Sequence, residues 1–269
     1  MSNFWQRTLT GAAFVVTVVV SVFLGAWWFS AFFSLVVFVG MMELRRMMDA
    51  DQVRSQKAMV YVLGLSVWTL STLELLAGID GRFWLLLVPL VVCVFVIELY
   101  RAKERPFWNV ASTLLIPFYV VVPFVFLQKL AFVGGDYNPY MVLSFFGMVW
   151  VNDTGAYLVG VTMGRHRLFP RISPKKSWEG FVGGVLLTVA LSYGLSHWIV
   201  GYAPALWLAV GFVVAVFGTL GDLTESMLKR TMDVKDSGTI LPGHGGVLDR
   251  FDAFTFAAPF VYVLFEIFK

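Results

Sequence analysis

The chain has 269 residues, of which 59% are hydrophobic and only 14% are charged, and its mean hydropathy is +0.79. This balance excludes a protein whose main solvent is water. The formal net charge of +3 is modest, and no nucleic-acid partner is expected. The single cysteine, Cys93, excludes a disulfide framework within the chain and a cysteine-based metal site.

Apolar runs of about 20 residues predict transmembrane helices, since that length crosses a hydrocarbon core of about 30 Å. Nine such runs are expected over residues 8–25, 27–44, 58–77, 83–100, 109–132, 140–163, 180–200, 205–226 and 251–268. The first two form one nearly unbroken apolar stretch, and the expected turn between them lies around Gly25-Ala26-Trp27. The predicted fold class is therefore an all-α integral membrane protein with about nine transmembrane helices.

The positive charges predict the orientation, because lysine and arginine gather in loops on the cytoplasmic side. Of the 20 lysines and arginines, only Arg82, Lys129 and Lys269 fall on one side, and the remaining 17 occupy the alternate loops. This asymmetry favours a cytoplasmic N-terminus and a periplasmic C-terminus. The expected location is a bacterial inner (cytoplasmic) membrane.

No internal repeat or linker is apparent, so residues 1–269 are interpreted as a single polytopic membrane domain. Residues 1–130 are mainly apolar spans and are expected to be scaffold. Polar motifs and glycines accumulate from Asn152 onward, which makes residues 140–269 the expected catalytic half. Three acids, Glu43, Glu74 and Glu98, lie near the ends of expected spans and are predicted to reach water.

Residues 221–252, around the end of the eighth expected span and the start of the ninth, are rich in charged groups. The carboxylates are Asp222, Glu225, Asp233, Asp236, Asp249 and Asp252, and the cations are Lys229, Arg230, Lys235 and Arg250. Carboxylates beside a membrane are costly to desolvate unless cations or a metal ion pair with them. Such oxygen ligands suit Mg²⁺, and the cations would neutralise phosphate charge. One interpretation is a nucleotide triphosphate site; the other is a solvated loop whose charges pair with one another and with anionic lipid headgroups.

The order of residues favours the first interpretation. The segment contains Ser226, Leu228, Lys229-Arg230, Lys235-Asp236, His244-Gly245-Gly246 and Asp249-Arg250-Phe251-Asp252. This order resembles the phosphatidate cytidylyltransferase family, also called CDP-diacylglycerol synthases. That family's pattern is a Ser, a hydrophobic residue, Lys-Arg, four residues, Lys-Asp, then His-Gly-Gly and Asp-Arg-x-Asp. Ala253 departs from it, because a serine is expected there, and this puts a hydroxyl role at that position in doubt.

A second segment, residues 152–180, also resembles the family. Asp153 lies within an apolar span, where a carboxylate is functional by default, although a polar bond to a neighbouring helix is the alternative. Residues 173–177 are expected to open the next helix, where Lys175, Lys176 and the backbone amides would hold an anion; alternatively the lysines only enforce topology. The spacing of Gly180 and Gly184 is typical of helix contact or dimerisation.

The resemblance implies that CTP and phosphatidic acid give CDP-diacylglycerol and pyrophosphate at the cytoplasmic side of the membrane. Mg²⁺ is the implied cofactor, and a second cation such as K⁺ would assist the leaving group. Asp222 and Asp249 are the leading metal ligands, with Asp252 and Asp236 as secondary candidates. The remaining catalytic candidates are Lys229, Arg230, His244 and Arg250. The substrate-binding candidates are Lys235, Asp236, Lys175, Lys176, Ser177, Asp153, Gly245 and Gly246.

Three alternatives remain open. Two are enzymes with similar phosphate chemistry: a CTP-dependent polyprenol or phytol kinase, and a synthase acting on ether-linked archaeal lipids. The third is a secondary transporter, which the many spans, Asp153 and the proline-interrupted helices would also suit. The expected partners are CTP, phosphatidic acid and membrane lipids, and a homodimer is left open.

Overall fold

The computed structural model describes residues 3–49, 53–238 and 245–268, with side chains from residue 10 onward. This part of the chain forms nine α-helices: α1 (Asn3–Phe23), α2 (Ala26–Met48), α3 (Lys57–Ala77), α4 (Leu87–Arg101), α5 (Pro106–Leu130), α6 (Pro139–Met163), α7 (Trp178–Leu195), α8 (Pro204–Thr231) and α9 (Phe254–Phe268). It also contains the 3₁₀ helices η1 (Gly81–Leu86) and η2 (Leu248–Arg250), and the strands β1 (Arg167–Phe169) and β2 (Ser173–Ser177).

The helices confirm the predicted all-α membrane fold. Within the described residues, α2, α3, η1 with α4, α5, α6, α7 and α8 are long and apolar enough to cross a membrane. The apolar stretches Thr10–Phe23 and Phe254–Phe268 are shorter. Each of the nine expected spans corresponds to one helix. The orientation of the termini stays a prediction.

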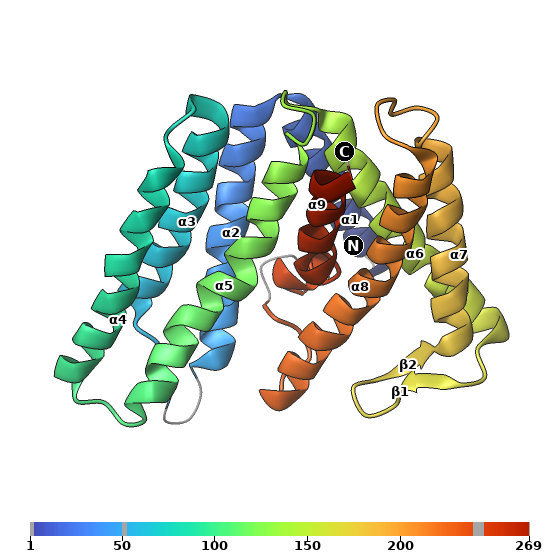
Figure 1. Ribbon diagram of the computed structural model, residues 1–269. Coiled ribbons are helices and arrows are strands. Elements are labelled where there is room, and N and C mark those ends of the chain that lie inside the picture. Colours follow the sequence, from blue (N-terminus) through green and yellow to red (C-terminus); the bar gives the residue numbers. More distant parts are fainter. Residues whose placement is uncertain (1–2, 50–52, 239–244, 269) are drawn as a thin grey trace. The chain divides into compact units, whose positions relative to one another are not determined.

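The chain divides into two compact units (Figure 1). Unit 1 contains Met1–Gln128 and Thr231–Arg250, and unit 2 contains Lys129–Arg230 and Phe251–Lys269. The charged segment that follows α8 therefore groups with the N-terminal helices. The expected scaffold and catalytic roles of residues 1–130 and 140–269 stay predictions.

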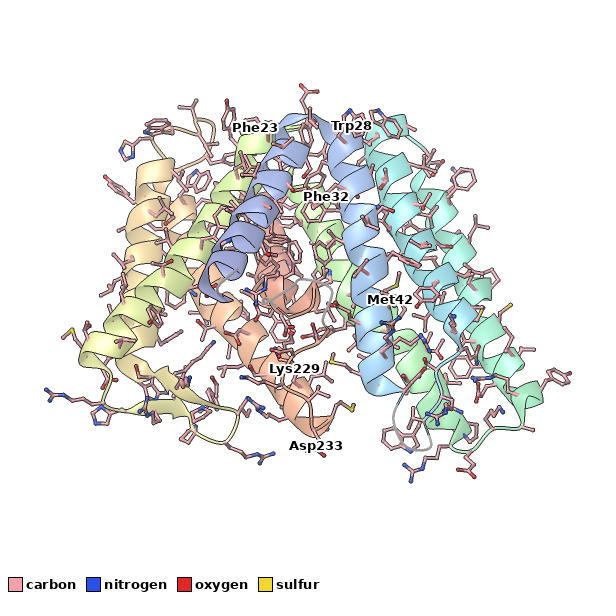
Figure 2. The ribbon with its side chains drawn as sticks, turned by 180° about the vertical axis from the view of Figure 1, so that it is seen from behind. Phe23, Trp28, Phe32, Met42, Lys229 and Asp233 are labelled. Carbon is pink, nitrogen blue, oxygen red and sulfur yellow. The ribbon has the colours of Figure 1, made fainter. Side chains whose placement is uncertain are left out.

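Unit 1 is built on α2, which follows α1 after a sharp turn. The turn contains Gly25, whose φ of +104° is available to glycine but costly for other residues. Figure 2 shows Phe23 and Trp28 beside this turn and Met42 toward the opposite end of α2. The side chain of Phe33 on α2 is buried and packs against Phe124 of α5, with ring centroids 5.6 Å apart.

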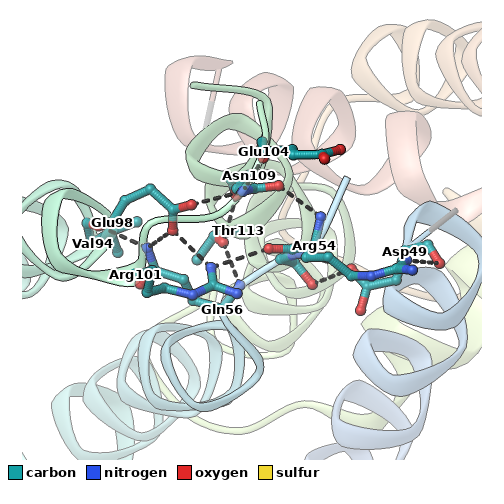
Figure 3. Close-up of polar contacts among 10 residues, drawn as sticks. Asp49, Arg54, Gln56, Val94, Glu98, Arg101, Glu104, Asn109 and Thr113 are labelled. Atoms are coloured by element: carbon teal, nitrogen blue, oxygen red, sulfur yellow. Dashed lines mark hydrogen bonds and ion pairs between the residues drawn. The ribbon is translucent and has the colours of Figure 1, made fainter. Parts of the chain in front are cut away.

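A buried polar network lies among α3, α4, α5 and the segment before α3 (Figure 3). The carboxylate of Glu98 accepts three hydrogen bonds of 2.7 Å, from Gln56 Nε2, Arg101 Nη1 and Asn109 Nδ2. The backbone amide of Gln56 donates to Thr113 Oγ1 at 2.8 Å. Because donors from three segments meet one carboxylate, the network fixes the packing of these segments.

The expectation that Glu43, Glu74 and Glu98 reach water is wrong for two of them. The exposed fractions of Glu43 and Glu98 are 2% and 5%. Both carboxylates receive hydrogen bonds from other segments of unit 1, and these donors replace water. Glu74 is partly buried and accepts a hydrogen bond from Trp84 Nε1 at 2.9 Å.

In unit 2, α6 and α7 lie side by side at close range (Figure 1). A Cβ atom added to Gly180 would lie 2.6 Å from the carbonyl oxygen of Ala156, and one added to Gly184 would lie 2.7 Å from Asn152 Oδ1. Only glycine permits this approach of the two backbones. The small-residue spacing thus marks a helix contact within the chain, and dimerisation stays a prediction.

The segment expected to open α7 is instead a strand. β1 and β2 pair in antiparallel fashion, and only Ser177 acts at the helix start, where its Oγ accepts from the amide of Gly180 at 3.1 Å. Pro174 explains the difference, because the residue before a proline is biased toward extended conformations. The hairpin lies at one end of α7 (Figure 1).

Aromatic side chains pack between α8 and α9 of unit 2. Phe217 stacks on Phe260 with centroids 3.8 Å apart, and the buried Trp207 meets Phe265 edge to face at 5.4 Å. The chain just before α9 also lies against α8, since a Cβ at Gly221 would lie 2.5 Å from the carbonyl oxygen of Asp252.

Candidate active site

A cavity of about 550 Å³ lies within unit 2, lined by α6, the β hairpin, α7 and α8. Five predicted site residues line it: Asp153, Lys175, Lys176, Ser177 and Asp222. They come from separate segments of the sequence, and the fold brings them around one space. Their individual roles stay predictions.

The lining of the cavity has a charged part and an apolar part. Arg167, Lys175 and Lys176 of the hairpin supply positive charge, and Asp153 and Asp222 supply negative charge. Val161 and Phe181 supply apolar surface, and the exposed fraction of Val161 is 69%. Such a lining suits a ligand with an anionic group and an apolar body.

An ion pair joins the hairpin to α8. Lys176 Nζ lies 2.5 Å from Asp222 Oδ2, and Ser226 Oγ donates to Asp222 Oδ1 at 3.2 Å. Each charged side chain of this pair is 28% exposed. Because the pair is at the edge of the cavity, an incoming anion would meet a lysine that is already held in place.

Carboxylates crowd together next to this pair. Burial raises the pKa of the Asp252 carboxyl well above its ordinary value, and the negative charges of Asp222, Glu225 and Asp153 raise it further. Carboxylate oxygens are the ligands that a hard cation such as Mg²⁺ prefers, and two of these four groups, Asp222 and Glu225, are already paired with Lys176 and Lys229. Among the described residues, no group of three or more His, Cys, Asp or Glu side chains is arranged to hold a metal ion. The magnesium site stays a prediction.

Asp249 lies in unit 1, in the short 3₁₀ helix η2. Its Oδ2 accepts hydrogen bonds from the amide of Ser237 at 2.9 Å, from Ser237 Oγ at 2.9 Å and from the amide of Gly246 at 2.8 Å. Gly245 has φ of +79°, and a Cβ there would lie 2.6 Å from Asp249 Oδ2. The Gly245-Gly246 pair therefore lets the backbone wrap around this carboxylate.

The other predicted residues lie in several places. Lys229 and Arg230 occupy the last turn of α8, where Lys229 Nζ pairs with Glu225 Oε1 at 3.2 Å. Lys235, Asp236 and Arg250 are exposed. His244 lies outside the described residues. Asp222 and Asp249 belong to different units, so their binding of one cation stays a prediction.

Several residues of these two regions were not predicted as site residues from the sequence: Asn152, Arg167, Thr219, Glu43 and Ser237. The first three line the cavity, and the last two hold the Asp249 loop. Glu43 carried a usable signal, because an acid inside an apolar span is functional by default. Nothing in the sequence pattern distinguishes Thr219 or Ser237 from other small polar residues.

The fold and the cavity define a class: an integral membrane protein whose site suits anionic groups. The family model of the cytidylyltransferase family matches residues 5–268. The chain therefore belongs to this family and is a nucleotidyltransferase. The resemblance inferred from residues 221–252 is confirmed.

Relatives of known name support this membership. A phosphatidate cytidylyltransferase from Staphylococcus saprophyticus is 35% identical over 266 residues, which cover 96% of this chain and 97% of that protein. One from Staphylococcus aureus is 41% identical over 180 residues, 65% of this chain and 67% of the relative. One from Bacillus subtilis is 48% identical over 125 residues, 45% of this chain and 46% of the relative.

Proposed function

We propose that this protein is a phosphatidate cytidylyltransferase, which converts CTP and phosphatidic acid into CDP-diacylglycerol and pyrophosphate for phospholipid synthesis. The observation that carries the proposal is the cavity of unit 2, where lysines and apolar side chains share one lining. A lipid phosphate with acyl chains matches such a lining. The full-length similarity to a phosphatidate cytidylyltransferase supports the same assignment.

The chemistry requires alignment of two anions more than it requires a base. A phosphate oxygen of phosphatidic acid forms a bond to the α-phosphorus of CTP, and the bond from that phosphorus to the bridging oxygen breaks as pyrophosphate leaves. The attacking oxygen is already anionic at neutral pH, so no strong general base is needed. Catalysis then rests on positioning and on neutralisation of charge.

The hairpin cations would supply much of that neutralisation. Lys175, Lys176 and Arg167 would bind triphosphate or headgroup oxygens, and Asp222 would hold Lys176 in place at 2.5 Å. Ser177 and Asp153 would contact substrate from the same cavity. Lys229, Arg230, Lys235, Arg250 and His244 would bind further phosphate oxygens, with Gly245, Gly246 and Asp236 shaping the loop.

The proposed cofactor is Mg²⁺, held by Asp222 and Asp249 with Asp252, and a second cation such as K⁺ is proposed beside the leaving group. Bound cations there would offset the negative charge that accumulates on the phosphates. The crowding of carboxylates around Asp252 supports this assignment, because a cation would relieve their repulsion.

The proposed location is the inner membrane of a bacterium, with the site facing the cytoplasm. The named relatives come from bacteria. The lysines and arginines of residues 165–176 and 229–250 lie in the connecting segments, or in the last turn of α8, that the charge asymmetry places on the cytoplasmic side. CTP is available there, and phosphatidic acid stays in the bilayer.

Product analysis tests the proposal. Purified protein in detergent receives phosphatidic acid and CTP labelled at the α-phosphate, with and without Mg²⁺. The expected result is Mg²⁺-dependent label in CDP-diacylglycerol together with free pyrophosphate. Release of labelled CDP would indicate a lipid kinase instead. Preference for an ether-linked archaeal lipid would change the substrate, and solute flux in sealed vesicles without CTP consumption would indicate a transporter.

A further inference from the structure

The loop that contains Asp249 is attached to α2 by one buried acid. Glu43, which directly follows the Met42 labelled in Figure 2, accepts hydrogen bonds from the backbone amides of Val247 and Leu248, both at 3.0 Å. The amide of Val247 donates to Oε1, and that of Leu248 donates to Oε2. The carboxylate is 2% exposed. Both of its oxygens are thus used by a segment about 200 residues away in the chain.

Ser237 connects Glu43 to Asp249. Its Oγ lies 3.4 Å from Glu43 Oε2 and 2.9 Å from Asp249 Oδ2, while its amide donates to the same Asp249 oxygen at 2.9 Å. The loop also closes tightly on Glu43, because a Cβ at Gly246 would lie 2.6 Å from Glu43 Oε2. Glu43, Ser237 and Asp249 therefore form one connected cluster within unit 1.

We propose that Glu43 is a positioning residue for the reaction: it holds residues 245–249 on α2 through the amides of Val247 and Leu248 and thereby fixes the direction of the Asp249 carboxylate. The inference rests on the proposed function, in which Asp249 is a metal ligand. Groups that orient a metal ligand typically change metal affinity or activity by about 10- to 100-fold when they are replaced.

The geometry requires a carboxylate at position 43. Two amides approach two different oxygens, and a glutamine would present an NH₂ group to one of them. A buried amide facing an NH₂ group loses its acceptor, so the loop would detach locally. Asp249 would then keep its own three hydrogen bonds but lose its fixed attachment to α2.

Glu98 offers a matched control. It is also a buried acid of unit 1 and also accepts three hydrogen bonds, but its partners are Gln56, Arg101 and Asn109, none of which contacts Ser237 or residues 245–249 through these bonds. Glu43→Gln and Glu98→Gln both replace a buried carboxyl group with an amide of similar size. Only the first touches the Asp249 loop, so a difference between the two variants separates positioning from general stability.

The experiment measures three quantities on purified wild type, Glu43→Gln and Glu98→Gln. These are hydrogen exchange of a peptide spanning residues 245–250, thermal stabilisation by added Mg²⁺ with CTP, and kcat with the Mg²⁺ concentration at half-maximal activity. For Glu43→Gln we expect at least about 10-fold faster exchange, a weaker Mg²⁺ stabilisation and about 10- to 100-fold lower kcat with a higher Mg²⁺ requirement. For Glu98→Gln we expect unchanged exchange in this peptide and an unchanged Mg²⁺ requirement.

Ser237→Ala provides a second variant with a small change in volume, in case Glu43→Gln does not fold. It should shift the Mg²⁺ requirement in the same direction by a smaller factor. The inference would be overturned if Glu43→Gln and Ser237→Ala both showed the exchange and the Mg²⁺ response of the wild type. It would also be overturned if Glu98→Gln changed both quantities as much as Glu43→Gln does. If the wild type made no CDP-diacylglycerol, the proposed function would fail, whereas exchange and Mg²⁺ stabilisation would still decide the role of Glu43.

Discussion

The polar network around Glu98 in unit 1 and the cavity in unit 2 use charged side chains in opposite ways. Glu98 receives three hydrogen bonds of 2.7 Å, one from the guanidinium of Arg101. In the cavity region, Asp252 faces the like charges of Asp222, Glu225 and Asp153, which raise its pKa. A satisfied network stabilises a fold, whereas buried groups of like charge cost stability and are more frequent at functional sites.

The largest effect is expected at the cavity for Asp222→Asn. This change removes the charge that pairs with Lys176 and one proposed Mg²⁺ ligand. The kcat/KM for CTP should fall by at least about 1,000-fold, because both substrate charge and cation binding are affected. Asp80→Asn is the control, since Asp80 is exposed and pairs with the exposed Arg82. Turnover above a tenth of wild type in Asp222→Asn would remove Asp222 from the site.

A smaller loss is expected for Lys176→Gln. The lysine lies on β2 at the edge of the cavity, and its loss leaves Asp222 without this cation. We expect kcat/KM for CTP to fall by about 100-fold. The loss of binding should be larger for a ligand with a triphosphate than for one with a diphosphate. Steady-state kinetics with CTP as the substrate and CDP as a competing ligand measure both effects. The exposed Lys103 provides a matched substitution, and equal kinetics in both variants would contradict the role of Lys176.

Glu98→Gln tests the other side of the comparison. It should reduce the free energy of unfolding by about 1–3 kcal/mol, since a buried charge-assisted network loses an acceptor. The KM for CTP and the kcat per folded molecule should stay at wild-type values. Thermal unfolding in detergent, read together with activity at a temperature where both proteins are folded, separates the two quantities. A change in KM without a change in stability would show that the network serves the reaction.

The smallest effect is expected for Asp252→Asn, which should increase the stability of the protein, whereas Glu98→Gln should decrease it. The pKa of Asp252 is raised in the folded state, so the group contributes stability below its unfolded pKa of about 4, and this contribution is lost as the pH rises through the folded pKa. Asp252→Asn removes this pH-dependent loss of stability. At pH 7 the melting temperature should therefore rise by roughly 2–4 °C while activity falls. Melting curves of both proteins from pH 5 to pH 8 should converge toward acidic pH. A less stable Asp252→Asn protein at pH 7 would show that the carboxylate is favourably bound.

Hydropathy predicted the nine helices because a run of about 20 apolar residues has few other ways to satisfy its backbone in a membrane. The turn at Gly25 and the contact of α6 with α7 through Gly180 and Gly184 also carried local signals. The strand over Ser173–Ser177 carried no comparable signal, because charged residues before a helix are compatible with a helix start and with a hairpin equally well. Pro174 was the only local hint.

The partners of the charged residues were harder to predict. The sequence indicated Asp222 and Lys176 separately, but their ion pair depends on how the hairpin folds back beside α8. Glu43 and Glu98 were predicted to reach water because hydropathy gives the position of a residue along a span. It gives no information about which side chains of other segments surround that residue. Their burial follows from donors on distant segments, namely Val247 and Leu248 for Glu43, and Gln56 and Asn109 for Glu98.

One labelling measurement tests the central contrast most directly. Wild type, Lys176→Gln and Glu98→Gln are purified and brought to equal folded concentrations, and each receives phosphatidic acid, Mg²⁺ and CTP labelled at the α-phosphate. We expect equal transfer of label into lipid for wild type and Glu98→Gln, and about a hundredth of that rate for Lys176→Gln. Equal rates in Lys176→Gln and wild type would contradict it.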